Sequence, residues 1–287
     1  MNQGKLREAI EVIGRQIELQ PDHSEHYHNR GYCLVELGDN QKAVEDLDRS
    51  ISLAPHRLES YRARAQAYFN LDKMTLAIAD HDHLIRARPD DYKELNNRAM
   101  AYDALGDIRR AIRDYLRSLK VRPGNKVVLG NLGLAYLEIG RRRAARKYLD
   151  LAVKAGPGDP AVYINRGYLR HVSGDLQGAF NDYNRAAQLE GGVVGAAGNR
   201  AVLMLQTGLF QQAVDDLILV IEAEPGNSLA YRMRGLAYAQ LGNTAHAISD
   251  LVSWAKLGPN ENETSRFPAY IDEQRLIGPK NERIVYE

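Results

Sequence analysis

Asparagine recurs at a fixed spacing in this sequence of 287 residues, and its side chain is suited to binding rather than to catalysis. The recurring residues, separated by 34 residues except for one gap of 68, are Asn29, Asn97, Asn131, Asn165 and Asn199. A carboxamide offers one carbonyl acceptor and two N–H donors. It can therefore hydrogen-bond both the C=O and the N–H of an extended peptide, whatever the sequence of that peptide. Asparagine is also a poor residue inside a helix, because its side chain competes for the backbone.

A row of large apolar residues runs three positions after the asparagines. Its members are Tyr32, Met100, Leu134, Tyr168 and Val202. On a helix, residues three apart share one face, so this row would form an apolar floor beside the carboxamides. Such a face is too apolar for an ordinary solvated surface. We therefore expect these ten residues to bind a peptide. The alternative is that asparagine is simply the usual residue at this point of a repeated sequence and contacts no ligand.

Other residues that could take part in catalysis or bind a metal lack the sequence context that such sites need. His23, His26 and His28 do not have the i,i+4 spacing that places two metal ligands on one helix face. The glycine-rich stretch 191–198 lacks the Gly-Lys-Ser/Thr ending of a phosphate-binding loop and follows an expected helix rather than a strand. The sequence therefore predicts no catalytic residues, no metal site and no cofactor, and the protein is not expected to be an enzyme.

A repeat of 34 residues sets the positions of these side chains. Proline marks its end at Pro21, Pro55, Pro89, Pro123, Pro157, Pro225 and Pro259, with Gly191 at the midpoint of the one double gap. Counting from the first residue of each repeat, position 8 is always Gly or Ala, position 20 is always Ala, and position 15 is Gly in six of seven repeats. Small residues let two helices approach closely, while the glycine and the proline end them. Each repeat is therefore expected to be helix A (positions 1–14), a tight turn and helix B (positions 17–30).

This pattern resembles the tetratricopeptide repeat family over residues 1–261. The resemblance implies an all-α, right-handed superhelical solenoid of antiparallel helix pairs, with the A helices on its concave face. The expected organisation is a half repeat at 1–23, a capping segment and tail at 262–287, and seven full repeats at 24–57, 58–91, 92–125, 126–159, 160–193, 194–227 and 228–261. The asparagine row is similar to the ladder in the repeat region of O-linked N-acetylglucosamine transferases, which implies contact with the backbone of a target.

Comparison between the repeats separates fold from function. Position 7 is Arg and position 23 is Asp in every repeat except 126–159, which has Leu132 and Tyr148 instead. Because both change together, we expect six partly buried ion pairs between helices A and B. An apolar replacement is tolerated where a buried ion pair and an apolar pair are nearly equal in free energy.

The predicted function is a cytoplasmic scaffold that holds an extended protein segment. The charge is balanced, with 38 Lys and Arg against 37 Asp and Glu, which gives no general case for nucleic acid or a membrane. Two alternatives stay open: the targeting region of a larger enzyme such as a glycosyltransferase, and an RNA-binding solenoid that uses the basic residues of 109–154. The half repeat at 1–23 lacks its own helix A, which leaves an apolar side open. Two interpretations follow: the chain is a piece of something longer, or this side joins a partner, as in self-association.

Overall fold

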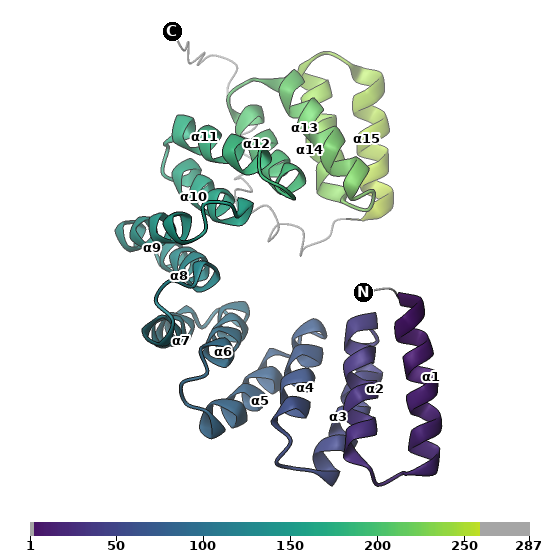
Figure 1. The fold of residues 1–287 in the computed structure, drawn as a ribbon. Helices are drawn as coiled ribbons and strands as arrows, with labels where there is room; N and C mark the ends of the chain where they lie inside the picture. Colours follow the sequence, from purple (N-terminus) through teal and green to yellow (C-terminus); the bar gives the residue numbers. More distant parts are fainter. Residues whose placement is uncertain (1–2, 259–287) are drawn as a thin grey trace. The chain divides into compact units, whose positions relative to one another are not determined.

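The computed structural model describes residues 3–258, and this part of the chain is entirely helical (Figure 1). The described residues fall into two compact units, which divide between Gly140 and Arg141. The helices of the first unit are α1 (Gln3–Leu19), α2 (Ser24–Leu37), α3 (Asn40–Leu53), α4 (Leu58–Asn70), α5 (Met74–Ala87), α6 (Tyr92–Ala104), α7 (Ile108–Val121) and α8 (Lys126–Glu138). Those of the second are α9 (Arg142–Ala155), α10 (Pro160–Val172), α11 (Leu176–Ala187), α12 (Val193–Gln206), α13 (Phe210–Ala223), α14 (Ser228–Gln240) and α15 (Thr244–Leu257). The expected capping segment at 262–287 lies outside the described residues.

The helices begin and end within about two residues of the expected positions, because the same local signals recur. Asp91 caps α6 and Asn125 caps α8 by accepting hydrogen bonds from backbone N–H groups of the first turn. The glycine at position 15 lies at positive φ, as at Gly38 (86°). Asp72 replaces this glycine in one repeat and also lies at positive φ, at 58°, where a side chain is strained.

Within each unit, every helix packs against the next along the chain, and neighbouring A helices also touch, as α2 with α4 and α6 with α8 do in the first unit. The alanine at position 20 is fully buried in most repeats, as at Ala43 and Ala111. The glycine at position 8 permits close packing, since a Cβ on Gly31 would lie 2.7 Å from Leu47 Cγ. These small residues bring helices A and B of a pair together.

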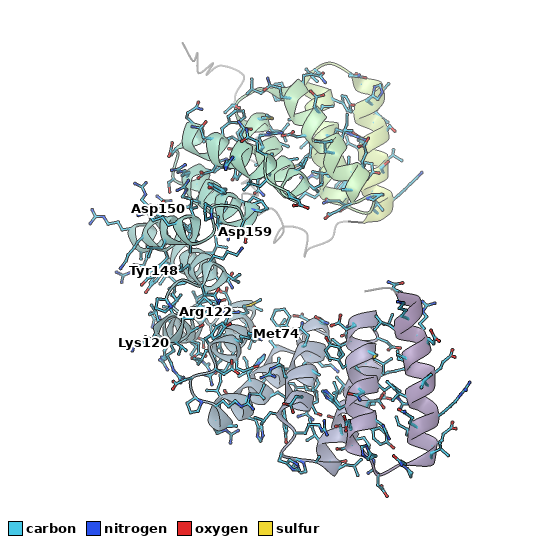
Figure 2. All side chains as sticks on the ribbon, in the orientation of Figure 1. Met74, Lys120, Arg122, Tyr148, Asp150 and Asp159 are labelled. Carbon is cyan, nitrogen blue, oxygen red and sulfur yellow. The ribbon has the colours of Figure 1, made fainter. Side chains whose placement is uncertain are left out.

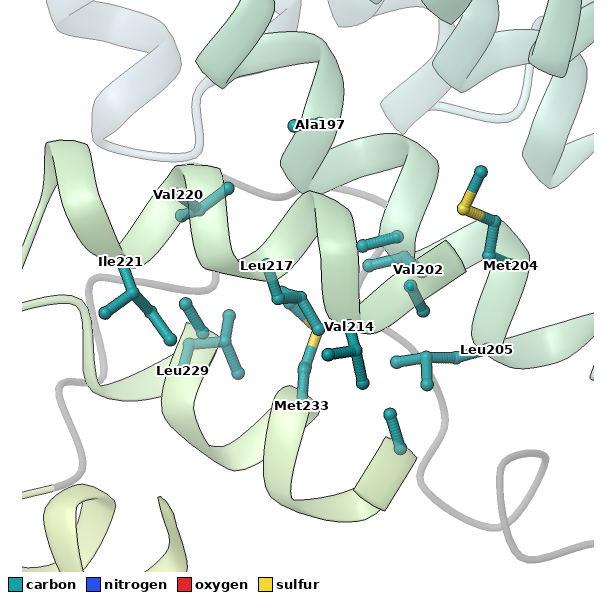
Figure 3. Packing of buried hydrophobic residues seen from close by; sticks show 14 residues of the cluster. Ala197, Val202, Met204, Leu205, Val214, Leu217, Val220, Ile221, Leu229 and Met233 are labelled. Carbon is teal, nitrogen blue, oxygen red and sulfur yellow. The ribbon is translucent and has the colours of Figure 1, made fainter. Parts of the chain in front are cut away.

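The largest apolar cluster of the second unit involves α12, α13 and α14. Val202, Leu205, Val214, Leu217 and Met233 pack side by side in it, and none is more than 6% exposed (Figure 3). Residues 196–199 and 201–205 of α12 are all buried. A helix that is apolar on nearly all sides is buried on nearly all sides. On α12, the residues at positions 6 and 9, Asn199 and Val202, are therefore buried rather than exposed.

Candidate functional site

Six bidentate ion pairs fix how helix A is rotated against helix B in every repeat except 126–159. As predicted, the arginine at position 7 donates through Nε and Nη2 to the two carboxylate oxygens of the aspartate at position 23. The pairs, with N–O distances of 2.5–2.9 Å, are Arg30–Asp46, Arg64–Asp80, Arg98–Asp114, Arg166–Asp182, Arg200–Asp216 and Arg234–Asp250. A helix turns by about 100° per residue. Holding position 7 toward helix B therefore turns positions 6 and 9 together toward the other side.

Four of these arginines also reach the preceding repeat, a contact that the sequence did not lead us to predict: Arg64, Arg98, Arg166 and Arg200. Nη1 of Arg64 donates to Asp48 at 2.6 Å, and Nη1 of Arg98 donates to Asp82 at 2.6 Å. The acceptors belong to helix B of the repeat before, at position 25. Each such arginine therefore links three helices and fixes the spacing between consecutive helix pairs.

In the first unit, the predicted asparagines offer free hydrogen-bonding groups. Asn29 is exposed, and Asn97 and Asn131 are half-buried. Within residues 3–258, neither Asn29 nor Asn131 makes a side-chain hydrogen bond, and Asn97 only accepts one, from Asn96 Nδ2 at 3.3 Å. A half-buried carboxamide without partners keeps its donors and acceptor available to a ligand.

The predicted apolar floor of the first unit is partly accessible. Tyr32 is 46% exposed, and Met100 and Leu134 are half-buried. Because these residues lie on the same A helices as the asparagines, the structure brings both predicted rows onto one side of α2, α6 and α8.

The second unit presents fewer of the predicted residues. Asn165 and Tyr168 of α10 are half-buried, whereas Asn199 is 2% exposed and Val202 is fully buried. Asn199 Nδ2 donates to the carbonyl of Gly195 in its own helix, and its Oδ1 has no partner among residues 3–258. Val202 belongs to the apolar cluster described above. Their burial does not support the expected ligand contacts of these two residues.

A pocket opens beside the asparagine row of the first unit. It has a volume of about 50 Å³ and is open to solvent. Its walls come from α4, α5 and α6, and the lining residues are Ala65, Gln66, Phe69, His81, Asn97 and Met100. Two predicted site residues, Asn97 and Met100, therefore line a cavity. Gln66 shares position 9 with the predicted apolar row, but its polarity kept it out of the prediction.

Behind this pocket lies a buried charged network that the sequence analysis missed. His81 Nδ1 lies 2.9 Å from Glu94 Oε2, and Arg62 Nε donates to Glu94 Oε1 at 2.5 Å. His81 is 4% exposed and Glu94 is 1% exposed. Burial alone would raise the pKa of Glu94, but the hydrogen bonds from His81 and Arg62 outweigh it and hold that pKa below its usual value. Glu94 is therefore a carboxylate that accepts from both neighbours.

A second pocket lies in the second unit. It has a volume of about 170 Å³, and α11, α12 and the turn after α12 supply its lining residues: Leu176, Gln177, Phe180, Leu203, Met204, Thr207 and Leu209. None of the ten predicted site residues contributes to it.

Two of the basic residues in and just after α7 contact neighbouring side chains. Arg110 pairs with Asp107 at 2.5 Å, and Arg122 donates to the hydroxyl of Tyr92. Figure 2 shows Lys120 and Arg122 near the C-terminal end of this helix. Arg109, Arg113 and Lys120 are exposed and form no hydrogen bond or ion pair within the described part of the chain.

The described residues contain no group of three or more side chains able to hold a metal ion. Nor is any helix among them sufficiently long and apolar to cross a lipid bilayer.

The stacked helix pairs define an all-helical repeat protein, and the comparisons identify its family. Sequence profiles described as tetratricopeptide repeat match residues 1–67, and residues 96–160, 131–193 and 199–262. The chain belongs to the tetratricopeptide repeat family. A direct comparison with curated proteins finds no match.

Solved structures of low sequence identity share the fold. Yeast Tom70 is 17% identical with a TM-score of 0.71, over 96% of this chain and 59% of its own. A chain of the APC/C hetero-tetramer Cut9–Hcn1 is 17% identical with a TM-score of 0.67, over 91% and 52%. A tetratricopeptide repeat protein from Parabacteroides merdae is 19% identical with a TM-score of 0.66, over 86% and 98%. This chain thus spans little more than half of the first two proteins.

Proposed function

We propose that the protein is a protein-interaction scaffold, and that the A helices of its first unit bind an extended segment of a partner. The observation that carries the proposal is a row of exposed or half-buried carboxamides whose Nδ2 groups have no hydrogen-bond partner among residues 3–258: Asn29, Asn97 and Asn131. Their Nδ2 groups are free to donate to carbonyl groups of a ligand. The fold already satisfies its own ion pairs and caps without them, so structure alone does not require asparagine there.

The geometry favours recognition of a peptide backbone rather than of one particular side chain. Asn97 and Asn131 lie on α6 and α8, which are in contact, and they occupy the same position of consecutive repeats. A ligand that runs across both helices meets the same donor and acceptor twice. Met100 and Leu134 lie beside them and supply apolar contact for side chains of that ligand.

The test compares two variants of the full chain against extended peptides selected from a random 12-residue library. Asn97→Ala/Asn131→Ala should weaken the binding of the selected peptides by at least about tenfold, because two hydrogen-bonded carboxamides are lost. Asn181→Ala, an exposed helical asparagine on α11, serves as the matched control and should leave binding unchanged. Equal affinity for the double variant and the control would refute the proposal.

The basic residues do not favour RNA as the ligand. Arg110 and Arg122 each contact a tyrosine ring of their own chain, Tyr102 and Tyr92 respectively. Proteins that bind single-stranded nucleic acid use aromatic rings on which bases stack. The rings of Tyr102 and Tyr92 are instead in contact with arginines of this chain. The preference for a peptide over RNA would be wrong if the protein bound RNA with an affinity that falls steeply with salt and that is unchanged by loss of Asn97 and Asn131.

A further inference from the structure

The network that joins the buried His81 and Glu94 to the partly exposed Arg62 is not needed by the fold, because other repeats fill the same three positions without charge. Positions 5 and 24 of one repeat and position 3 of the next are Gly198, Leu217 and Ala230 between the sixth and seventh repeats. Leu217 and Ala230 are fully buried in a common apolar cluster. A buried charged network is rarely more stable than well-packed apolar residues of similar size. The network around Glu94 therefore has a reason other than stability.

The hydrogen bonds of Glu94 determine what His81 presents to the pocket. A carboxylate only accepts hydrogen bonds. The Nδ1 atom, 2.9 Å from Glu94 Oε2, must therefore carry the proton. In a neutral imidazole the other nitrogen is then an acceptor. That atom, Nε2, has no hydrogen-bond partner among residues 3–258, and the imidazole lines the pocket.

The charges around the pocket disfavour an anionic ligand. Arg62 is the cation of the network, and Nη2 of this arginine also lies 3.6 Å from Asp91 Oδ2. Two carboxylates, Glu94 and Asp91, thus face one guanidinium. A carboxylate in the pocket would meet the lone pair of His81 Nε2 and two further negative charges. The apolar walls, Phe69 and Met100, in turn favour the carbon atoms of a side chain.

We infer that this pocket is a specificity pocket that binds a partner's hydroxyl or carboxamide side chain, which donates a hydrogen bond to His81 Nε2. The inference rests on the proposed function, because the partner's backbone is held by the neighbouring Asn97 and Asn131. Asn97 also lines the pocket, so one residue contacts both the backbone and the bound side chain. Threonine and serine fit best, since the cavity is small and is lined by the apolar Phe69 and Met100 as well as by His81.

The experiment selects peptides from the random 12-residue library on the native chain and on His81→Leu/Glu94→Ala. This variant copies Leu217 and Ala230, and it leaves no buried charge because Arg62 keeps its contact with Asp91. Peptides selected on the native chain should share a serine, threonine, asparagine or glutamine at one position. Replacing threonine there by valine should weaken binding about tenfold. The variant should bind the threonine and valine peptides equally.

The outcomes separate the two proposals. Selected peptides that depend on Asn97 and Asn131, but that tolerate valine in place of threonine at every position, overturn the specificity pocket alone. If the selected peptides bind Asn97→Ala/Asn131→Ala as tightly as the native chain, the proposed function is overturned, and this inference with it. The exchange of threonine for valine is measured on the native chain, so the test stands even if the double variant does not fold.

Discussion

Replacing Arg98 by leucine should destabilise the first unit, and replacing Asp114 by tyrosine in the same chain should recover much of the loss. Arg98 donates through Nε to Asp114 Oδ2 at 2.7 Å and through Nη2 to Oδ1 at 2.8 Å. Asp114 is 2% exposed. Without Arg98 its nearest remaining cation is Arg117, at 3.7 Å. Leaving a buried carboxylate without its main partner costs about 3 kcal/mol.

The double variant copies the residues that the chain itself has at 132 and 148. Arg98→Leu/Asp114→Tyr removes both buried charges, so its stability should return to within about 1 kcal/mol of the native chain. The remaining difference comes from Asp82, which also loses Arg98 but is exposed enough to be solvated. Changing Asp82 to leucine as well would copy Leu116, which has the same position in the next repeat.

Native-state hydrogen exchange of the α6 and α7 amides measures this directly, because repeat proteins need not unfold in one step. The single variant should exchange at least about 100-fold faster than the native chain, and the double variant should lie close to the native rate. Arg110→Leu is the control, since its ion pair with Asp107 is exposed and its loss should not change exchange measurably. Equal exchange in the single and double variants would refute the reasoning.

Three further substitutions test local features of the first unit. Burial and the nearby charge of Glu138 raise the pKa of Asp103 to about 6. The folded state therefore binds more protons than the unfolded state between about pH 4 and 6, and its stability falls as pH rises through that window. Thermal unfolding should show Asp103→Asn to be more stable than the native chain at pH 8, and this advantage should shrink at pH 5; an advantage independent of pH would contradict the assignment. Asp72→Gly should raise the unfolding free energy by about 1 kcal/mol in urea titration, because φ is 58° there; a decrease would show that the aspartate is not strained. Gly14→Asp should slow exchange in α1, because a Cβ there would lie 3.8 Å from Arg30 Nη1, and an unchanged rate would mean that no ion pair forms.

The sequence predicted the fold and the Arg–Asp pairs because both repeat within the chain. Helix ends follow from glycine, proline and the capping residues, which act locally. The pairing of Arg98 with Asp114 could be inferred because Leu132 and Tyr148 change together. The second contact, from Arg98 to Asp82, was missed because it joins neighbouring repeats. Its signal was present, since Leu116 precedes the repeat that lacks the arginine.

The candidate site was predicted less completely, because exposure depends on what packs against a helix. A strict period implies equal exposure for Asn131 and Asn199, yet only Asn199 is buried. Its helix, α12, is apolar around almost its whole surface, and that composition was the available signal. The pocket beside Asn97 was missed because His81 and Glu94 meet across the boundary of two repeats. Comparing the same positions in other repeats would have shown that only this boundary joins a buried histidine to a glutamate.

Backbone recognition by the asparagine row is tested most directly with a peptide whose backbone amides are N-methylated one at a time. The peptide is one selected on the native chain, and its affinity for the native chain is compared with that for Asn131→Ala. If Asn131 binds the backbone, one methylated position should weaken binding to the native chain by about tenfold and have little further effect on the variant. A loss that is the same for both proteins at every position would contradict the account.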